Sequence, residues 1–256
     1  MDDTKEDPVL YEKSGGVATI TLNQPMNRNA LTPGLLDGLG GFLEEAIDDP
    51  DARLCVIANT PPAFCAGADL ASSGAQSRYD LPAILRMIAE AAKPVIARIE
   101  GYCFGGGIGI AAACDLSVAT SESIFAFSEV RVGVAPAIIS VFCLPKMSRG
   151  DSLELFLTGE RFDAIRAQRV GLITRAASQD AIDEVIAGWS RSILLGGPGA
   201  LAAAKRLIYS VPDMSGAEAL DIMSGLSREL FSSPEAAEGM KAFREKRKPY
   251  WALGAH

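Results

Sequence analysis

Short apolar runs recur along the first half of the chain and predict the strands of a sheet. Residues 17–22 alternate apolar side chains with threonine, and residues 53–58, 95–99 and 116–119 are short runs rich in apolar residues. Runs of this length, bounded by turn-forming residues, are typical of partly or fully buried strands. The chain is therefore predicted to contain a sheet whose strands are separated by longer segments.

Longer stretches between and after these runs have the spacing of helices. Thr32 followed by Pro33 is a helix-start pattern, and apolar residues at helical intervals continue to about Ile47. A second helix is predicted over residues 81–92. After about Gly150 the pattern predicts helices at residues 153–157, 162–170, 180–194, 200–209, 216–231 and 234–246, and a brief strand at 171–173. The fold class is therefore α/β, with a helical C-terminal region.

The stretch after the predicted strand at 95–99 is a glycine-rich bend that leads into a helix. Gly101 and the run from Gly105 to Gly107 precede residues 108–113, which are apolar and rich in alanine. A helix that begins at such a bend leaves several backbone N–H groups without intrahelical acceptors. These donors and the helix dipole together favour a negatively charged oxygen.

Three interpretations of the bend are compatible with these residues. Gly107, Gly109 and Ala112 satisfy a loose G-x-G-x-x-A pattern, and Glu129 follows at about the acidic spacing of a dinucleotide-binding motif. Alternatively, the amides form an oxyanion hole, whose donors point at an oxygen that gains charge during a reaction. In the third interpretation the glycines only permit close packing of helix against strand.

Glu129 is a candidate acid/base because it lies among apolar residues. Burial of a carboxylate disfavours its ionised form and raises its pKa, which is common in catalytic groups. The alternative is an ion pair between Glu129 and Arg131 on the surface. The loop from Phe64 to Leu70, rich in small residues, is either another close approach of backbone to a ligand or an ordinary strand-to-helix connection.

Composition narrows the chemistry further. The chain has 256 residues, of which 48% are hydrophobic, and a net charge of −8. These values suit a large folded core and argue against general nucleic-acid binding. The only histidine is His256, which removes Ser-His-Asp and Cys-His catalysis and argues against a metal site. Carboxylates and backbone donors must therefore perform any catalysis.

Cysteine usage and the N-terminal segment predict an intracellular, cytoplasmic protein. The five cysteines include no C-x-x-C pair and have apolar neighbours, which predicts reduced, mostly buried thiols. Residues 1–8 are acidic, lack an apolar signal core and are expected to be disordered. No apolar run reaches membrane-spanning length, so no membrane partner is expected.

Six segments in a fixed order make the chain resemble a known family. They are Arg28-Asn29-Ala30-Leu31; Phe64-Cys65-Ala66-Gly67-Ala68-Asp69-Leu70; Lys93-Pro94-Val95-Ile96-Ala97 with Gly101-Tyr102 and Gly105-Gly106-Gly107; Cys114-Asp115; Phe127-Ser128-Glu129-Val130 with Gly133 and Pro136; and Phe243 with Glu245-Lys246-Arg247. Together they resemble the enoyl-CoA hydratase/isomerase family, the crotonase superfamily, from Val17 to Trp251. Six ordered segments are more specific than one glycine motif, so the resemblance disfavours the dinucleotide interpretation.

The resemblance implies a ClpP/crotonase-like spiral of strand–strand–helix repeats. It assigns residues 1–195 to an α/β core with the ligand site, and residues 196–256 to a helical region that forms homotrimers, often paired into hexamers. The implied substrate is an acyl-CoA thioester. No metal or separate cofactor is implied, because coenzyme A is part of the substrate.

The resemblance also assigns catalytic roles. The two backbone amides that bind the thioester carbonyl in the family match Ala68 and Gly106, and the second of two hydratase glutamates matches Glu129. The first glutamate would fall at position 109, where this chain has glycine. Glu129 would then act alone, and a side chain at position 109 would be expected to face the bound double bond.

The departure at Gly109 leaves the reaction open. The run at 127–140 is most similar to bacterial hydratases of branched or unsaturated acyl-CoAs, which favours an enoyl-CoA hydratase. A Δ3,Δ2-enoyl-CoA isomerase is the second expectation, and an acyl-CoA-binding protein without catalysis is the third.

Contacts with the substrate are implied by the same resemblance. The residues that match the family's coenzyme A contacts are Arg28, Ala66, Ala68, Asp69, Leu70, Phe243 and Lys246. Phe243 and Lys246 form an aromatic–lysine pair that is often supplied by a neighbouring subunit. The family often has a lysine where this chain has Ala71. The acyl group is expected between residues 72–85 and 137–142.

Overall fold

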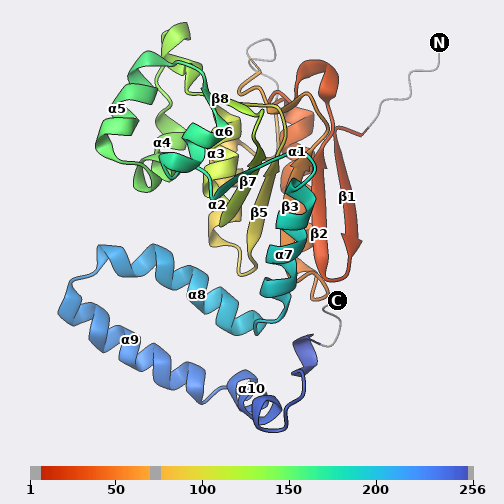
Figure 1. Ribbon diagram of the computed structural model, residues 1–256, viewed down its shortest axis with the longest axis vertical. Helices are drawn as coiled ribbons and strands as arrows, with labels where there is room; N and C mark the ends of the chain where they lie inside the picture. The colour runs from red at the N-terminus through yellow and green to blue at the C-terminus, as the bar shows by residue number, and fades with distance from the viewer. Residues whose placement is uncertain (1–6, 70–75, 253–256) are drawn as a thin grey trace.

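Six strands form the larger of two sheets in the computed structural model, which describes residues 7–69 and 76–252 (Figure 1). In spatial order they are β1 (Val9–Ser14), β2 (Val17–Leu22), β3 (Leu54–Asn59), β5 (Val95–Ile99), β7 (Leu116–Thr120) and β10 (Arg175–Ala177). β1 and β2 pair antiparallel, and the other neighbours pair parallel. Every residue of β3 is buried, as expected of a central parallel strand covered on both faces.

A smaller sheet lies alongside and is built from very short strands. Within the described residues its order is β4 (Ala63–Cys65), β6 (Tyr102–Phe104), β8 (Ile124–Ala126) and β9 (Phe162–Asp163). β4, β6 and β8 are parallel neighbours, and β9 closes the sheet antiparallel to β8. Strands of two or three residues are too short for alternation of apolar and polar positions to reveal them, so the sequence did not predict this sheet.

Successive turns of the chain contribute one strand to each sheet and then a helix. β3 and β4 are followed by α2 (Leu81–Glu90), and β5 and β6 by α3 (Gly106–Ala113). β7 and β8 are followed by the 3-10 turn η2 (Ser128–Val132) and α4 (Ala137–Cys143). This arrangement confirms the predicted strand–strand–helix spiral.

The helix α3 lies in the middle of the core. All its residues are buried, which the small and apolar run of glycine, isoleucine and alanine permits. α2 and α4 both pack against it. The long helix α1 (Pro33–Asp48) begins as predicted, since the Thr32 hydroxyl accepts a hydrogen bond from the Leu35 amide at 3.2 Å. Its buried face joins the same core.

The segment after α4 differs from the prediction in two places. It contains η3 (Leu144–Lys146), α5 (Arg149–Thr158) and α6 (Ala164–Arg169). Phe162 and Asp163, predicted to be helical, instead form β9. The strand predicted at 171–173 is wrong, because Gly171 has a φ of +85° and the strand β10 begins only at Arg175. Leu172 and Ile173 lie in a turn and are buried in the core, so their apolar character reflects this burial and not pairing in a sheet.

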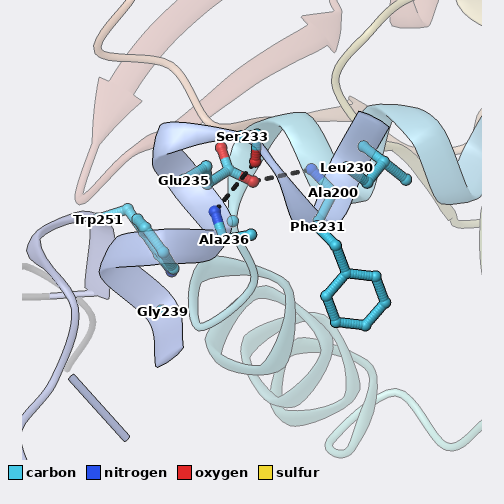
Figure 2. Close-up of a pocket in the computed structure, with 9 residues that line it drawn as sticks. Ala200, Leu230, Phe231, Ser233, Glu235, Ala236, Gly239 and Trp251 are labelled. Atoms are coloured by element: carbon cyan, nitrogen blue, oxygen red, sulfur yellow. Dashed lines mark hydrogen bonds between the residues drawn. The ribbon is translucent and has the colours of Figure 1, made fainter. Parts of the chain in front are cut away.

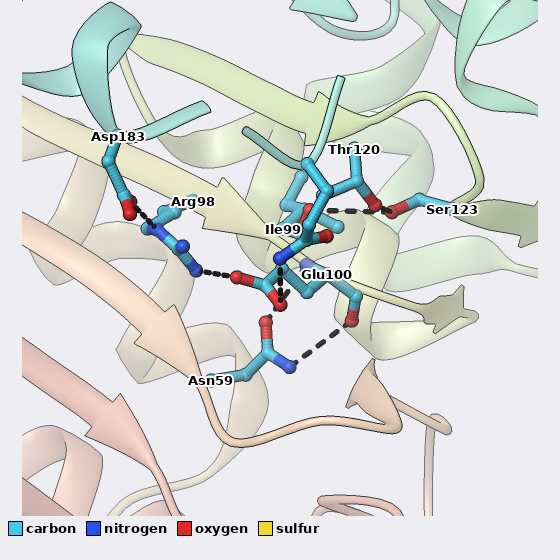
Figure 3. Close-up of polar contacts among 8 residues, drawn as sticks. Asn59, Arg98, Ile99, Glu100, Thr120, Ser123 and Asp183 are labelled. Atoms are coloured by element: carbon cyan, nitrogen blue, oxygen red, sulfur yellow. Dashed lines mark hydrogen bonds and ion pairs between the residues drawn. The ribbon is translucent and has the colours of Figure 1, made fainter. Parts of the chain in front are cut away.

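The helix α7 (Ile182–Leu194) is held to the larger sheet by a polar network (Figure 3). Arg98 of β5 donates from Nε to the Asp183 carboxylate at 2.8 Å and also pairs with Glu100. Asn59, at the end of β3, exchanges two hydrogen bonds with the Glu100 backbone, at 3.1 and 3.0 Å. The network therefore joins two strands and a helix that are far apart in the sequence.

The C-terminal helices extend away from the two sheets (Figure 1). They are α8 (Pro198–Ser210), η4 (Val211–Asp213), α9 (Gly216–Phe231), α10 (Pro234–Arg244) and η5 (Tyr250–Ala252). Glu235 of α10 accepts hydrogen bonds from the Gly199 and Ala200 amides, both at 2.9 Å, and so caps the start of α8. Figure 2 shows the bond from Ala200. α9 has no buried residue in this single chain.

One buried ion pair anchors α8 to the core. Lys205 Nζ lies 2.9 Å from the Asp115 carboxylate and donates to the Ile88 carbonyl at 2.8 Å.

At the other end of the chain, Asp7 and Pro8 belong to the described part of the segment predicted to be disordered. The Pro8 carbonyl accepts a hydrogen bond from the Asn23 amide at 2.8 Å.

Candidate active site

A cavity of about 470 Å³ lies where the glycine-rich bend, the loop after β4 and the segment after β8 meet. It is lined by Leu31, Ala66, Gly67, Ala68, Leu81, Gly105, Gly106 and by residues of 128–139. Among the described residues, only Ser128, Glu129 and Arg131 contribute polar side chains to this lining. The structure thus brings the predicted residues Ala66, Ala68, Gly106 and Glu129 together around one largely apolar space.

Two backbone amides indicate what kind of ligand this cavity binds. Gly106 is the first residue of α3, so its N–H has no intrahelical acceptor, and the Gly105 carbonyl instead accepts from Ile108 and Gly109. Within the described part of the chain, neither the Gly106 nor the Ala68 amide has a hydrogen-bond acceptor. Two unsatisfied donors at one cavity, one at a helix N-terminus, can stabilise an oxygen that gains negative charge.

Gly105 allows a carboxylate to approach the bend. Its φ is +48°, a conformation that favours glycine, and a Cβ built on it would lie 3.1 Å from Oε1 of Glu129. A side chain at position 105 would therefore crowd the carboxylate. The glycine at this position places Glu129 beside the start of α3.

Glu129 has the environment expected of an acid/base. Burial raises the pKa of its carboxyl, and Oε2 is buried without a hydrogen-bond partner among the described residues. The alternative pairing with Arg131 is wrong, because no ion pair joins these two described residues. The Arg131 guanidinium instead donates to the Thr158 carbonyl at 3.4 Å. The Glu129 carboxylate is therefore left available to a ligand.

The loop that contains Arg28 is tied to the loop that contains Ala68. The Ala66 amide donates to the Arg28 carbonyl at 3.0 Å, and the Leu31 amide donates to the Gly67 carbonyl at 2.9 Å. Arg28 itself is exposed, next to the cavity-lining loop. Two segments of the predicted coenzyme A contact are thus adjacent, although their residues are far apart in the sequence.

Asn29 is a positioning residue to which the sequence assigned no role. Its fully buried side chain accepts from the Gln24 amide at 2.6 Å and donates to the Ala63 carbonyl at 2.7 Å and the Thr60 carbonyl at 3.2 Å. These bonds satisfy the buried amide and join the loop before α1 to both ends of the β3–β4 connection. In the sequence, the only indication of this role was that Asn29 belongs to the Arg28–Leu31 segment that resembles the family.

Position 109 points toward the apolar wall of the cavity. Gly109 is fully buried in α3, and a Cβ built on it would lie 2.4 Å from Cγ2 and 3.0 Å from Cβ of Ile139. Ile139 of α4 occupies the space next to Gly109, and the expectation that a side chain here would face a bound double bond stays a prediction. Ile139 itself lines the cavity, so its wall is apolar here.

The structure distinguishes the three interpretations of the bend, because its glycines have different surroundings. A Cβ on Gly107 would lie 2.7 Å from the Cys65 Cβ, so Gly107, like Gly109, permits close packing. Gly105 and Gly106 line the cavity, but the Gly105 amide donates to the Ala126 carbonyl at 3.2 Å, so of the two only the Gly106 amide fits the oxyanion hole. The dinucleotide interpretation is wrong, because the strands form a two-sheet spiral and Glu129 lies beside Gly105.

The remaining predicted contacts with coenzyme A are not brought together in one chain. Asp69 is half-buried beside the cavity loop, whereas Leu70, like Ala71, lies outside the described residues. Phe243 is 85% exposed and borders a different cavity, on α10. Lys246, just beyond α10, does not line the catalytic cavity either.

The described residues contain neither a metal-binding cluster nor a reactive thiol. No group of three or more His, Cys, Asp or Glu residues in that part of the chain is placed to hold a metal ion. All the cysteines are free and buried, and burial raises the pKa of Cys65 to about 12, so this thiol is a poor nucleophile. None of the helices in residues 7–69 and 76–252 is both long and apolar enough to cross a bilayer.

Comparison with known proteins identifies the family of the chain. The sequence profile described as "Enoyl-CoA hydratase/isomerase" matches residues 12–253. The chain is 32% identical over 253 residues to the carnitinyl-CoA dehydratase of Citrobacter koseri, covering 94% of this chain and 97% of that protein. The crystal structure of an enoyl-CoA hydratase from Shewanella pealeana superimposes with a TM-score of 0.90 at 28% identity, covering 97% of each chain. That of an enoyl-CoA hydratase from Mycobacterium smegmatis gives a TM-score of 0.88 at 31% identity, covering 96% of this chain and 99% of the other. Together with the spiral fold and the paired free amides, these matches show that the chain belongs to the enoyl-CoA hydratase/isomerase family and has the crotonase fold.

Proposed function

We propose that the protein is an enoyl-CoA hydratase in which Glu129 is the single acid/base and the Ala68 and Gly106 amides form the oxyanion hole. The observation that carries the proposal is one cavity that brings together two backbone donors and a half-buried carboxylate. Within residues 7–69 and 76–252, neither donor has an acceptor and one carboxylate oxygen has no partner. The thioester carbonyl binds at the amides. The double bond then lies next to the carboxylate.

The reaction balances with one carboxylate. Glu129 removes a proton from water as the water oxygen bonds to C3, and the electron pair of the double bond moves onto the thioester as an enolate. The two amides stabilise this charge more than they stabilise the substrate. Protonated Glu129 then gives its proton to C2, which restores the carboxylate. A single placed acid/base contributes about 10²–10⁴-fold in rate.

A second candidate, the Δ3,Δ2-enoyl-CoA isomerase, is favoured by the apolar wall at Ile139. No other carboxylate lines the cavity among the described residues. An isomerase needs only one, which takes a proton from C2 of a 3-enoyl-CoA and returns it to C4. Reaction in ¹⁸O-labelled water separates the two candidates, because only hydration incorporates the label into the product.

The C-terminal region completes the proposal. We infer that residues 196–256 mediate association into trimers, and that a neighbouring subunit brings Phe243 and Lys246 to the coenzyme A site. Exposed apolar side chains on α9 and α10, such as Leu220, Phe231 and Phe243, support this inference. Light scattering of the purified protein would measure the assembly, and a monomer would contradict it.

The test of the catalytic role compares Glu129→Gln with the matched exposed control Glu122→Gln. We expect Glu129→Gln to lower kcat at least 10²-fold on a panel of 2-enoyl- and 3-enoyl-CoAs while crotonyl-CoA still binds. Glu122→Gln, at an exposed turn, should leave turnover unchanged. Unaltered turnover in Glu129→Gln would refute the proposal. Tight binding by the wild type without turnover of any substrate would instead indicate a non-catalytic acyl-CoA-binding protein.

A further inference from the structure

A second cavity lies near the carboxyl end of α4. It measures about 660 Å³, and its lining is mostly apolar but also contains Lys146 and the Asp115–Lys205 ion pair. Other lining residues include Pro94, Ala112, Val141, Phe142, Leu201 and Tyr209. It lies between the end of α3, the end of α4 and the helix α8. None of the residues of the catalytic cavity belongs to this lining.

The two cavities lie at opposite ends of the contact between α3 and α4. On α3, Gly106 lines the catalytic cavity and Ala112 lines the second one. Gly109 lies three residues from each, so it is on the same side of the helix and between them. On α4, Ile139 lines the first cavity and Phe142, three residues later, lines the second.

Ile139 packs directly against the α3 backbone at Gly109. It is 2% exposed, and its Cγ2 occupies the space that a Cβ of residue 109 would need, with Leu85 Cδ1 at 3.6 Å from the same point. Because Gly109 has no side chain, Ile139 is the nearest side chain to this position on the α3–α4 face. A smaller residue at 139 would leave space that reaches the Gly109 backbone and extends toward the second cavity.

We propose that Ile139 is the residue that sets the acyl-chain length accepted by the enzyme. It closes the apolar end of the catalytic cavity and so restricts the acyl group to short chains. The proposal rests on the proposed function only in that the cavity holds the acyl part of a CoA thioester. It assigns to Ile139 a contact with the substrate and no part in proton transfer.

The experiment compares Ile139→Ala with Ile88→Ala, a matched removal of an equally buried isoleucine that lines neither cavity. The ratio of kcat/KM for 2-decenoyl-CoA to that for crotonyl-CoA should rise at least tenfold in Ile139→Ala and stay unchanged in Ile88→Ala, since each methylene accommodated is worth about tenfold or more. Val141→Trp places bulk at an exposed position of the second cavity and should cancel the gain in the Ile139→Ala background.

A readout without chemistry keeps this proposal separate from the proposed reaction. Calorimetric titration with butyryl-, octanoyl- and dodecanoyl-CoA should show the same shift toward long chains in Ile139→Ala. An unchanged chain-length profile in a folded Ile139→Ala, or a wild type that already prefers decenoyl-CoA, would overturn the proposal. If Ile139→Ala does not fold, Ile139→Val should shift the ratio in the same direction by a smaller factor, and an unchanged ratio there would overturn it too. If the wild type turns over no substrate but the binding profile of Ile139→Ala is shifted toward long chains, only the proposed reaction is contradicted.

Discussion

The overlap between positions 109 and 139 predicts a strong energetic coupling that a double-mutant cycle can measure. An alanine Cβ at position 109 would lie 2.4 Å from Ile139 Cγ2, whereas carbon atoms in favourable contact are about 3.5–4.0 Å apart. Overpacking of this kind costs about 1–3 kcal/mol. Alanine in a helix is also about 1 kcal/mol more favourable than glycine, which offsets part of the cost.

In the Ile139→Ala background the Cγ2 atom at 2.4 Å is absent, and only the Cβ of residue 139, at 3.0 Å, still crowds the added methyl group. Gly109→Ala should then raise the free energy of unfolding by at most about 1 kcal/mol through helix propensity. In the wild-type background the same change should lower it by up to about 2 kcal/mol, which is the difference between the overpacking cost and the propensity gain. The two substitutions are therefore expected to be coupled by about 1–3 kcal/mol.

The assay is urea denaturation followed by circular dichroism for the wild type, both single variants and the double variant. Gly41→Ala serves as the control, because Gly41 lies within α1 and a Cβ there would meet nothing within 4 Å. This control should be stabilised by about 1 kcal/mol. Additive effects of Gly109→Ala and Ile139→Ala would refute the claim that Ile139 fills the space at position 109.

Glu129, Lys205 and Asn29 give four further predictions. Burial raises the pKa of Glu129 above the ordinary value of 4.5, so the pH profile of kcat/KM should begin to fall on acidification at a pH above 4.5. A fall that occurs only at or below pH 4.5 would contradict the role of the buried carboxylate as base. The same shift means that the folded state favours the protonated form, so wild-type stability relative to Glu129→Gln should fall as pH rises through that pKa, and a rise would contradict it. Lys205→Met leaves the buried Asp115 carboxylate unpaired and should lower the free energy of unfolding by about 3–5 kcal/mol, while Lys205→Met combined with Asp115→Leu should recover most of the loss. Asn29→Ala leaves buried backbone groups unsatisfied and should lower the free energy of unfolding by about 1–3 kcal/mol, measured by thermal or urea denaturation. KM should also rise, because the Arg28 loop loses its support. A change in stability near zero would show that water replaces the amide.

The sequence by itself determined the long elements and the chemical type of the site. Local patterns decide these features, since apolar periodicity and the Thr32–Pro33 start already specify α1, and β2, β3, β5 and β7 of the larger sheet are apolar runs. The edge strands β1 and β10 are not such runs, and the sequence did not predict them. The absence of any histidine before His256 and the glycine-rich bend directed attention to backbone donors and to Glu129. These residues do line one cavity.

Only the tertiary structure decided what each of these residues faces. The direction of a side chain depends on helices and strands that are distant in the sequence, so no local pattern shows that Glu129 lies beside Gly105 rather than pairing with Arg131. For the same reason the sequence could not show that Ile139 occupies the space in front of Gly109. The smaller sheet also required the fold, because its short strands are stabilised by pairing between successive turns of the spiral and not by their own pattern.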